Sequence, residues 1–247
     1  MGECITKIHE KYIDNIGKKY WGNKTPRLVQ WYDIVAKEMP DVSFIYTVRD
    51  PRGVANSLKR SKAHLLNVLE GAKTYNLYAE RCLEMEKEIP DRVKCIYYEK
   101  LVHEPEKIVS DLCKWLGISY ESHMINDYYA QKTSVTKAEH VFKHHKNINK
   151  PIDSSSAEKW KEQLTSKEIS LISYYTAKQI KLLGYNYLQK HYAPQKIYLL
   201  HLKIEGIFIS FYKLIRNLWT RPNLFSILKR KLILGTFWEN FEYFLRT

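Results

Sequence analysis

The sequence predicts an α/β protein of three layers, in which helices cover a parallel sheet, with a helical extension at the carboxyl end. The 247 residues suffice for a sizeable core, and their 45% hydrophobic content excludes a disordered chain. Apolar runs typical of strands alternate with stretches of helical periodicity, and this order is the signature of a parallel sheet with covering helices. We expect an α/β domain over residues 1–190 and a separate extension over residues 195–247.

The amino-terminal part should begin with a helix over residues 3–18, because isoleucines and a tyrosine recur there on one side. A short strand is expected to follow over residues 19–22. A second helix then begins, since Thr25 can cap it and Pro26 fits its first turn without leaving an amide unpaired.

The central strand is predicted over residues 42–48, where β-branched and aromatic residues give the pattern of a mostly buried strand. The strand stops abruptly before Asp50 and Pro51. The Asp50 side chain can accept from the free amides of a following helix, and Pro51 is suited to the first helical position. A long helical region should therefore extend from Pro51 to about Glu88.

A third strand is expected over residues 93–98, followed by a helix that begins at Pro105. Residues 119–156 show little periodicity and hold four histidines, which is typical of a long loop or a lid over the carboxyl edge of the sheet. A compact helical unit comes next, with a capping box at Thr165 and a natural helix stop at Gly184.

The carboxyl-terminal extension is basic and amphipathic. From Lys196 to Thr247 it holds nine Lys and Arg against three Glu, interleaved with large apolar residues at helical spacing. Its longest uncharged runs have seven residues, far short of the roughly 20 needed to span a bilayer. Such a helix can pack on the domain or on a second copy, which we favour, or lie on a membrane surface.

The net charge indicates which partners the chain can bind, and the cysteines indicate whether it holds a metal or disulfides. A formal net charge of +13 favours anionic partners, among them nucleotides and acidic surfaces. The four cysteines form no CxxC pair and show no zinc spacing, and the loop histidines lack a completing carboxylate or cysteine, so no metal is expected. No signal peptide is readable, and we expect a cytoplasmic protein, peripheral to a membrane if the extension lies on one.

Arg49 and Ser57 form the sharpest chemical pattern in the chain. Arg49 ends the central strand, and Ser57 lies eight residues later, about two turns along the helix that follows. Open α/β sheets bind ligands at the carboxyl ends of their strands, and a guanidinium with a hydroxyl suits an anion. On this stretch alone, an anion clamp and an ordinary strand-to-helix turn are equally supported.

The stretch from Arg49 to Ser57 resembles the 3′-phosphate-binding segment of sulfotransferases, enzymes that use 3′-phosphoadenosine-5′-phosphosulfate (PAPS). There a strand ends in Arg-Asp-Pro and a serine follows eight residues after the arginine. The resemblance is closest to the tyrosylprotein branch and covers residues 20–185. It implies a P-loop-like sulfotransferase fold, in which Arg49 and Ser57 bind the 3′-phosphate of the nucleotide.

Three other segments carry the resemblance in family order. Lys24, in Asn-Lys-Thr-Pro, matches the lysine that stabilises the transition state. Tyr98, in Tyr-Glu-Lys-Leu, matches the tyrosine that contacts the adenine, and an aromatic ring is a suitable platform for a base. Lys159 precedes Trp160 and keeps the spacing from Lys150 that marks a nucleotide-binding lysine in tyrosylprotein sulfotransferases.

The amino-terminal region departs from the family pattern. Sulfotransferases begin with a strand and a glycine-rich loop that wraps the 5′-phosphosulfate with backbone amides. The first forty residues hold no Gly-Thr or Ser-Gly pair, so we expect the fold to be incomplete at its amino end. We favour a truncated gene product with an exposed apolar sheet edge. The alternative is a divergent or inactive member in which another subunit or the first helix fills the gap.

The leading hypothesis is transfer of a sulfuryl group from PAPS to a hydroxyl acceptor, which would be a protein tyrosine, a glycan or a small alcohol. Lys24 is the expected catalytic residue, and Arg49, Ser57, Tyr98 and Lys159 are the expected nucleotide ligands. Because the 5′-phosphosulfate loop is absent, the sequence leaves open whether this form is active or inactive. No nucleic-acid partner is expected, and residues 196–247 would provide the membrane contact or self-association.

Two competing functions follow from other features of the sequence. A P-loop kinase would share the sheet type, but it needs a Walker loop, and the sequence has none. A non-catalytic basic module would instead bind a membrane surface or nucleic acid through the charged extension.

Overall fold

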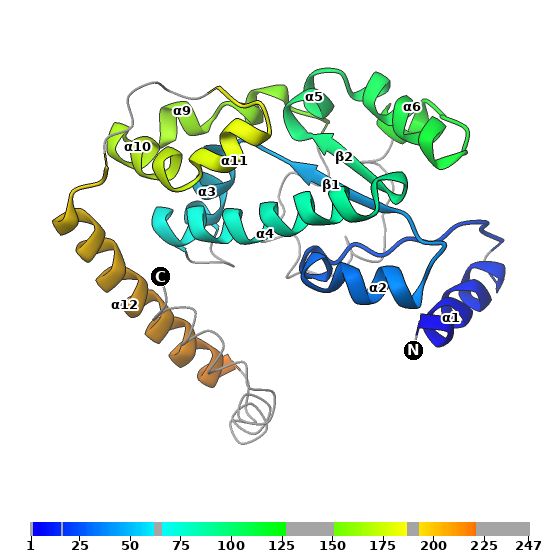
Figure 1. The fold of residues 1–247 in the computed structure, drawn as a ribbon, viewed down its shortest axis with the longest axis horizontal. Helices are drawn as coiled ribbons and strands as arrows, with labels where there is room; N and C mark the ends of the chain where they lie inside the picture. Colours follow the sequence, from blue (N-terminus) through cyan, green and yellow to red (C-terminus); the bar gives the residue numbers. More distant parts are fainter. Residues whose placement is uncertain (1, 16, 62–65, 127–150, 187–192, 221–247) are drawn as a thin grey trace. The chain divides into compact units, whose positions relative to one another are not determined.

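The computed structural model describes residues 2–15, 17–61, 66–126, 151–186 and 193–220 (Figure 1). The chain divides into two compact units, Met1–Leu199 and Leu200–Thr247. In the first unit, helices pack against a two-stranded parallel sheet, as the order of strand and helix patterns predicted. The boundary between the units falls inside the last helix that the structure describes, a little beyond the expected one.

The sheet consists of β1 (Phe44–Val48) and β2 (Val93–Tyr97), which pair in parallel from Phe44 opposite Val93 to Val48 opposite Tyr97. Both strands lie where the sequence predicted them, each shorter at one end. Successive side chains of β1 point to opposite faces of the sheet, so Val48 is buried while Ile45 is 46% exposed. The central strand is therefore buried on one face, whereas the sequence predicted a mostly buried strand.

Two helices, α3 (Pro51–Arg60) and α4 (Val68–Glu88), form most of the connection between the strands. Asp50 caps α3 as predicted, because its carboxylate accepts from the Arg52 backbone amide at 2.8 Å. The expected single helical region is thus divided, and Asn67 caps α4 through the backbone amide of Glu70 at 3.0 Å. α4 packs along α3 and against β2 (Figure 1).

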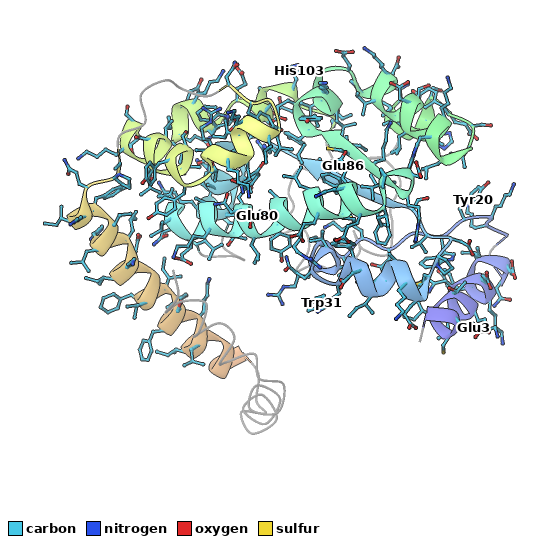
Figure 2. All side chains as sticks on the ribbon, viewed as in Figure 1. Glu3, Tyr20, Trp31, Glu80, Glu86 and His103 are labelled. Atoms are coloured by element: carbon cyan, nitrogen blue, oxygen red, sulfur yellow. The ribbon has the colours of Figure 1, made fainter. Side chains whose placement is uncertain are left out.

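The main core of the first unit lies between the sheet and α4. Tyr46 donates from this core to Glu86 at 2.6 Å, and Tyr32 of α2 (Tyr32–Glu38) donates to Glu88 at 2.6 Å. Figure 2 labels Glu86 on α4. Burial raises the pKa of both phenols, to about 12 for Tyr32, so both remain neutral donors. The buried members of this core are Tyr32, Tyr46, Val48, Tyr75, Ala79, Met85, Val93 and Leu183.

Gly71 marks the closest approach of α4 to α3, since an added Cβ there would lie 3.1 Å from the Ala55 Cα and 3.2 Å from its Cβ. Overpacking costs about 1–3 kcal/mol, more than the gain of about 1 kcal/mol in helix propensity. We therefore expect Gly71→Ala to lower the free energy of unfolding by about 1 kcal/mol in urea denaturation. Gly22→Ala, with no atom within 4 Å of the new Cβ, is the control and should not destabilise. Equal midpoints for the two variants would contradict the close approach.

The amino-terminal segment differs from the sequence prediction. α1 spans Gly2–Asn15, and residues 19–22 form no strand, so the strand expected there is wrong. Trp21 stacks on His9 of α1 with ring centroids 4.1 Å apart, which holds the segment without strand pairing. The helix predicted at Pro26 begins as a 3₁₀ helix, η1 (Pro26–Trp31), and continues as α2.

Arg92 joins the segments that precede the two strands. It ends the 3₁₀ helix η2 (Pro90–Arg92) and donates to the carbonyl of Val42 at 3.0 Å. It also donates to the carbonyls of Ala36 at 3.2 Å and Met39 at 2.9 Å. These two carbonyls lie at the carboxyl end of α2, where helical partners are lacking. One guanidinium therefore satisfies the end of α2 and anchors it to the sheet.

The remaining part of the first unit is helical, and only part of the predicted lid at 119–156 lies within the described residues. The capping box predicted at Thr165 is confirmed, with Glu168 as its partner. The helix then breaks at Thr176, whose hydroxyl donates to the Ile172 carbonyl at 2.7 Å. The helices are α5 (Tyr98–His103), α6 (Pro105–Leu116), α7 (His123–Asn126), η3 (Ser154–Ala157), α9 (Trp160–Gln163), α10 (Ser166–Tyr175) and α11 (Ala177–Leu182).

The helix predicted for the extension is α12 (Lys196–Thr220), which begins in the first unit and continues into the second. Many of its large apolar side chains are exposed, among them Ile197 at 77% and Phe208 at 69%. Of the helices in the described ranges, none is both long and apolar enough to cross a membrane.

Candidate functional site

The ends of the two strands bring Arg49 and Tyr98 together. Arg49 follows β1 directly and Tyr98 follows β2 directly, and the parallel register sets Val48 opposite Tyr97. The two following residues therefore emerge at the same edge of the sheet. The guanidinium carbon of Arg49 lies 4.3 Å from the centroid of the Tyr98 ring, a cation–π contact that holds both side chains.

The hydrogen-bond donors of the Arg49 side chain are only partly used by protein partners. Its Nη2 donates to the carbonyl of Ser156 at 2.5 Å, and its own carbonyl accepts from the Tyr75 hydroxyl at 3.0 Å. Its Nε is buried and has no hydrogen-bond partner among the described residues. A buried donor without a partner costs about 1–3 kcal/mol, so the guanidinium retains capacity for an anionic acceptor.

Gly53 allows this guanidinium to approach α3 closely. A Cβ at Gly53 would lie 2.9 Å from the Arg49 Nε and 3.3 Å from the Trp160 Cδ1, so a side chain there would crowd both. Ser57 is exposed on α3, four residues after Gly53 and therefore one turn further along the same helix face. Ser57 thus lies on the side of α3 that the Arg49 side chain contacts at Gly53.

Lys159 joins the group through Ser156. The Ser156 carbonyl binds Arg49, while its hydroxyl accepts from Lys159 at 3.3 Å. Lys159 also pairs with Asp153 at 2.8 Å, and both side chains are about half exposed. Lys159 and then the Ser155 hydroxyl hold the pKa of Asp153 well below its usual range. An exposed pair of this kind is weak, so a phosphate could compete with Asp153 for the lysine.

A buried ion pair between Arg52 and Asp50 stabilises the segment that follows β1. Arg52 donates to both carboxylate oxygens of Asp50, at 2.8 and 2.5 Å, and the two side chains are only 4% and 9% exposed. The guanidinium also lies 4.3 Å from the Trp160 ring centroid, next to Lys159 in the chain. The pair thus couples the start of α3 to α9.

Glu99 connects the two strand ends. Its Oε1 accepts from the Asp50 backbone amide at 2.9 Å, and its Oε2 accepts from the Tyr185 hydroxyl at 2.9 Å. Burial raises the pKa of Tyr185 and of the neighbouring Tyr75, so both phenols stay protonated. Glu99 therefore accepts from two neutral donors, the Tyr185 hydroxyl and the Asp50 amide, whereas the Asp50 carboxylate is paired with Arg52.

Of the five residues predicted for the site, the structure brings Arg49, Tyr98 and Lys159 into one group and sets Ser57 on the adjoining helix face. Lys24 is exposed before η1, and no contact within the described part of the chain joins it to Arg49. Sequence reasoning missed Ser156, Asp153 and Glu99. The run from Asp153 to Ser156 is a helix-capping pattern, which was the readable signal for the first two.

Metal ligation has no support in the described ranges, where no three His, Cys, Asp or Glu side chains gather into a metal site. His140, His144 and His145 of the predicted lid lie outside those ranges, as does Lys150. His123 is within them, and its ring faces Glu121 at 3.1 Å on the surface.

The chain is similar to known proteins in both sequence and fold. Residues 6–122 match a model described as "Sulfotransferase family". The chain is 22% identical over 174 residues to a protein-tyrosine sulfotransferase of Drosophila melanogaster, covering 66% of this chain and 34% of that protein. It is 22% identical over 111 residues to a putative protein-tyrosine sulfotransferase of Caenorhabditis briggsae, covering 43% and 40%. The chain thus spans little more than a third of the length of these curated relatives.

Two solved structures have a similar fold. The sulfotransferase domain from the curacin biosynthetic pathway superposes with a TM-score of 0.60 at 20% identity, over 74% of this chain and 69% of that domain. The sulfotransferase domain from the Synechococcus PCC 7002 olefin synthase superposes with a TM-score of 0.53 at 20% identity, over 66% and 58%.

Proposed function

We propose that this chain is a member of the sulfotransferase family, that it binds PAPS and that its site serves sulfuryl transfer to a hydroxyl acceptor, since its sequence matches the family model and its fold is that of sulfotransferase domains. The observation that carries the proposal is the grouping of Arg49, Tyr98 and Lys159 at the carboxyl ends of the two strands. These residues are distant in sequence, and each supplies a feature that a phosphorylated adenosine needs.

Each residue has a defined task in this proposal. Arg49 and Lys159 supply positive charge to the 3′-phosphate, and Ser57 supplies a hydroxyl donor. Tyr98 supplies an aromatic surface for the adenine. Gly53, which has no side chain, lets the Arg49 guanidinium lie close against α3. The donor set therefore fits a dianionic phosphate next to a purine.

The chemistry that PAPS supplies when bound is a sulfuryl group whose bond to the bridging oxygen breaks as a bond to the acceptor oxygen forms. Lys24 neutralises the charge that develops on the leaving oxygen, and a base takes the acceptor's proton. A protein tyrosine is our first acceptor, because relatives are named protein-tyrosine sulfotransferases. A glycan or a small alcohol is the alternative.

Binding and transfer are separate parts of the proposal. The group around Arg49 is proposed for the 3′-phosphate and the adenine, while Lys24 is the residue proposed for the 5′-phosphosulfate, and no contact among the described residues joins Lys24 to the Arg49 group. We therefore propose nucleotide binding as the property of this chain to be measured first, with transfer slow or absent when the chain acts alone.

Calorimetric titration with adenosine 3′,5′-bisphosphate and with adenosine 5′-monophosphate tests the proposal directly. The two ligands differ only in the 3′-phosphate, so we expect the monophosphate to bind at least about tenfold more weakly, because hydrogen bonds to charged groups contribute about 1.5–3 kcal/mol. Failure of the bisphosphate to bind would reject the proposal. Equal affinities would show that the Arg49 group does not recognise a 3′-phosphate.

A further inference from the structure

We propose that α12 lies on the surface of an acidic lipid bilayer, with its apolar face toward the lipid. The apolar face is a set of large side chains that are each between 40% and 77% exposed. Its members are Ile197, Leu200, Ile204, Ile207, Phe208, Phe211, Tyr212 and Ile215.

The spacing of these residues makes them a continuous surface. At 3.6 residues per turn, they fall within less than half of the helix circumference. Leu202 lies on the opposite side of the same helix and is buried. The exposed apolar side chains thus form one continuous patch on one side of α12. They are not isolated surface residues.

Charge favours an acidic lipid surface over a second copy as the occupant of this face. Lys196 and Lys203 border the apolar face, and the segment from Lys196 to Thr247 has nine Lys and Arg against three Glu. Two copies that met through this face would bring like charges together. Anionic headgroups instead complement the lysines, and each basic residue near such a surface adds to binding.

The residue types agree with an interfacial position. Aromatic residues lie on the apolar face itself, and Phe, Tyr and Trp are favoured where a bilayer meets water. The sequence after α12 repeats this composition, with Lys229, Arg230 and Lys231 followed by Phe237 and Trp238. No helix in the described part of the chain is both long and apolar enough to span a bilayer, so the position that we propose for α12 is on the membrane surface.

Co-sedimentation of the full chain with lipid vesicles tests this inference. We expect binding to vesicles that contain phosphatidylserine, at least about tenfold tighter than to pure phosphatidylcholine, and weakened by salt. The double variant Phe208→Ser with Phe211→Ser should bind at least about tenfold more weakly, since both rings lose their burial in lipid. Lys196→Glu with Lys203→Glu should remove the preference for phosphatidylserine.

The matched control is Tyr174→Ser, which removes an exposed aromatic ring from α10 and should leave vesicle binding unchanged. Circular dichroism establishes that each variant is folded. Binding to neither vesicle, or equal binding by the folded Phe208 and Phe211 variant, would overturn the inference. The inference would also be overturned if the wild type sedimented as a dimer without lipid and the Phe208 and Phe211 variant did not. That result would assign the apolar face to a second copy of the chain.

Discussion

Arg49→Ala is expected to weaken the binding of adenosine 3′,5′-bisphosphate by about 10- to 150-fold, because a hydrogen bond to a charged group contributes about 1.5–3 kcal/mol. Arg49 contacts both Tyr98, which we propose for the adenine, and the Ser156 carbonyl beside Lys159, so its loss also removes the link between these two parts of the proposed site. The affinity for adenosine 5′-monophosphate should change much less. Calorimetry on both ligands measures the difference.

Arg49→Lys separates charge from geometry in the same experiment. Lysine retains the positive charge but lacks the planar fork that stacks on a ring and donates in two directions. We expect an affinity between those of the wild type and Arg49→Ala. Lys114→Ala removes one exposed positive charge from α6 and serves as the control for net charge. Equal binding by wild type and a folded Arg49→Ala variant would remove Arg49 from the site.

Arg52→Ala is expected to lower the free energy of unfolding by about 3–5 kcal/mol, because it leaves the Asp50 carboxylate buried without its partner. Both side chains are under 10% exposed, and the guanidinium also donates to the Asn186 carbonyl at 3.3 Å. Among the described residues, the Arg52 backbone amide would still donate to this carboxylate. Urea denaturation followed by circular dichroism measures the loss.

The double variant Asp50→Asn with Arg52→Met tests whether this loss comes from the unpaired charge. Asparagine can still cap α3, and methionine fills the space beside Trp160 without a charge. We expect this variant to recover most of the lost stability. Lys107→Ala breaks an exposed pair with Glu104 and should leave the midpoint unchanged. If Arg52→Ala behaves like Lys107→Ala, the pair does not support the strand end.

The parts of the fold that follow local rules were predictable from the sequence. Asp50 and Pro51 fix the start of α3, and Thr165 with Glu168 fixes the start of α10, because capping needs only neighbouring residues. The strand expected over 19–22 is wrong, since strand residues need a partner that the sequence cannot display. The division of the region after Pro51 had a readable signal in the Asn67 cap.

The site was predictable to the extent that it follows the strand ends. Arg49 and Tyr98 each come directly after a strand, so a parallel sheet brings them together whatever lies between. Ser156 and Glu99 could be assigned only from the structure, because the Ser156 carbonyl and the Glu99 carboxylate bind partners that are distant in sequence. The sulfotransferase fold itself, which the motif order suggested, is confirmed.

The side chains that flank the strand pair also determine its alignment. Arg92, just before β2, binds the carbonyl of Val42 before β1, and Glu99, just after β2, binds the amide of Asp50 after β1. A slip of one residue would move one strand by about 3.3 Å and turn its side chains to the opposite face. Both bonds would break together, at opposite ends of the ladder. These two hydrogen bonds therefore stabilise the observed register of the strands. The same register fixes the position of Arg49 relative to Tyr98.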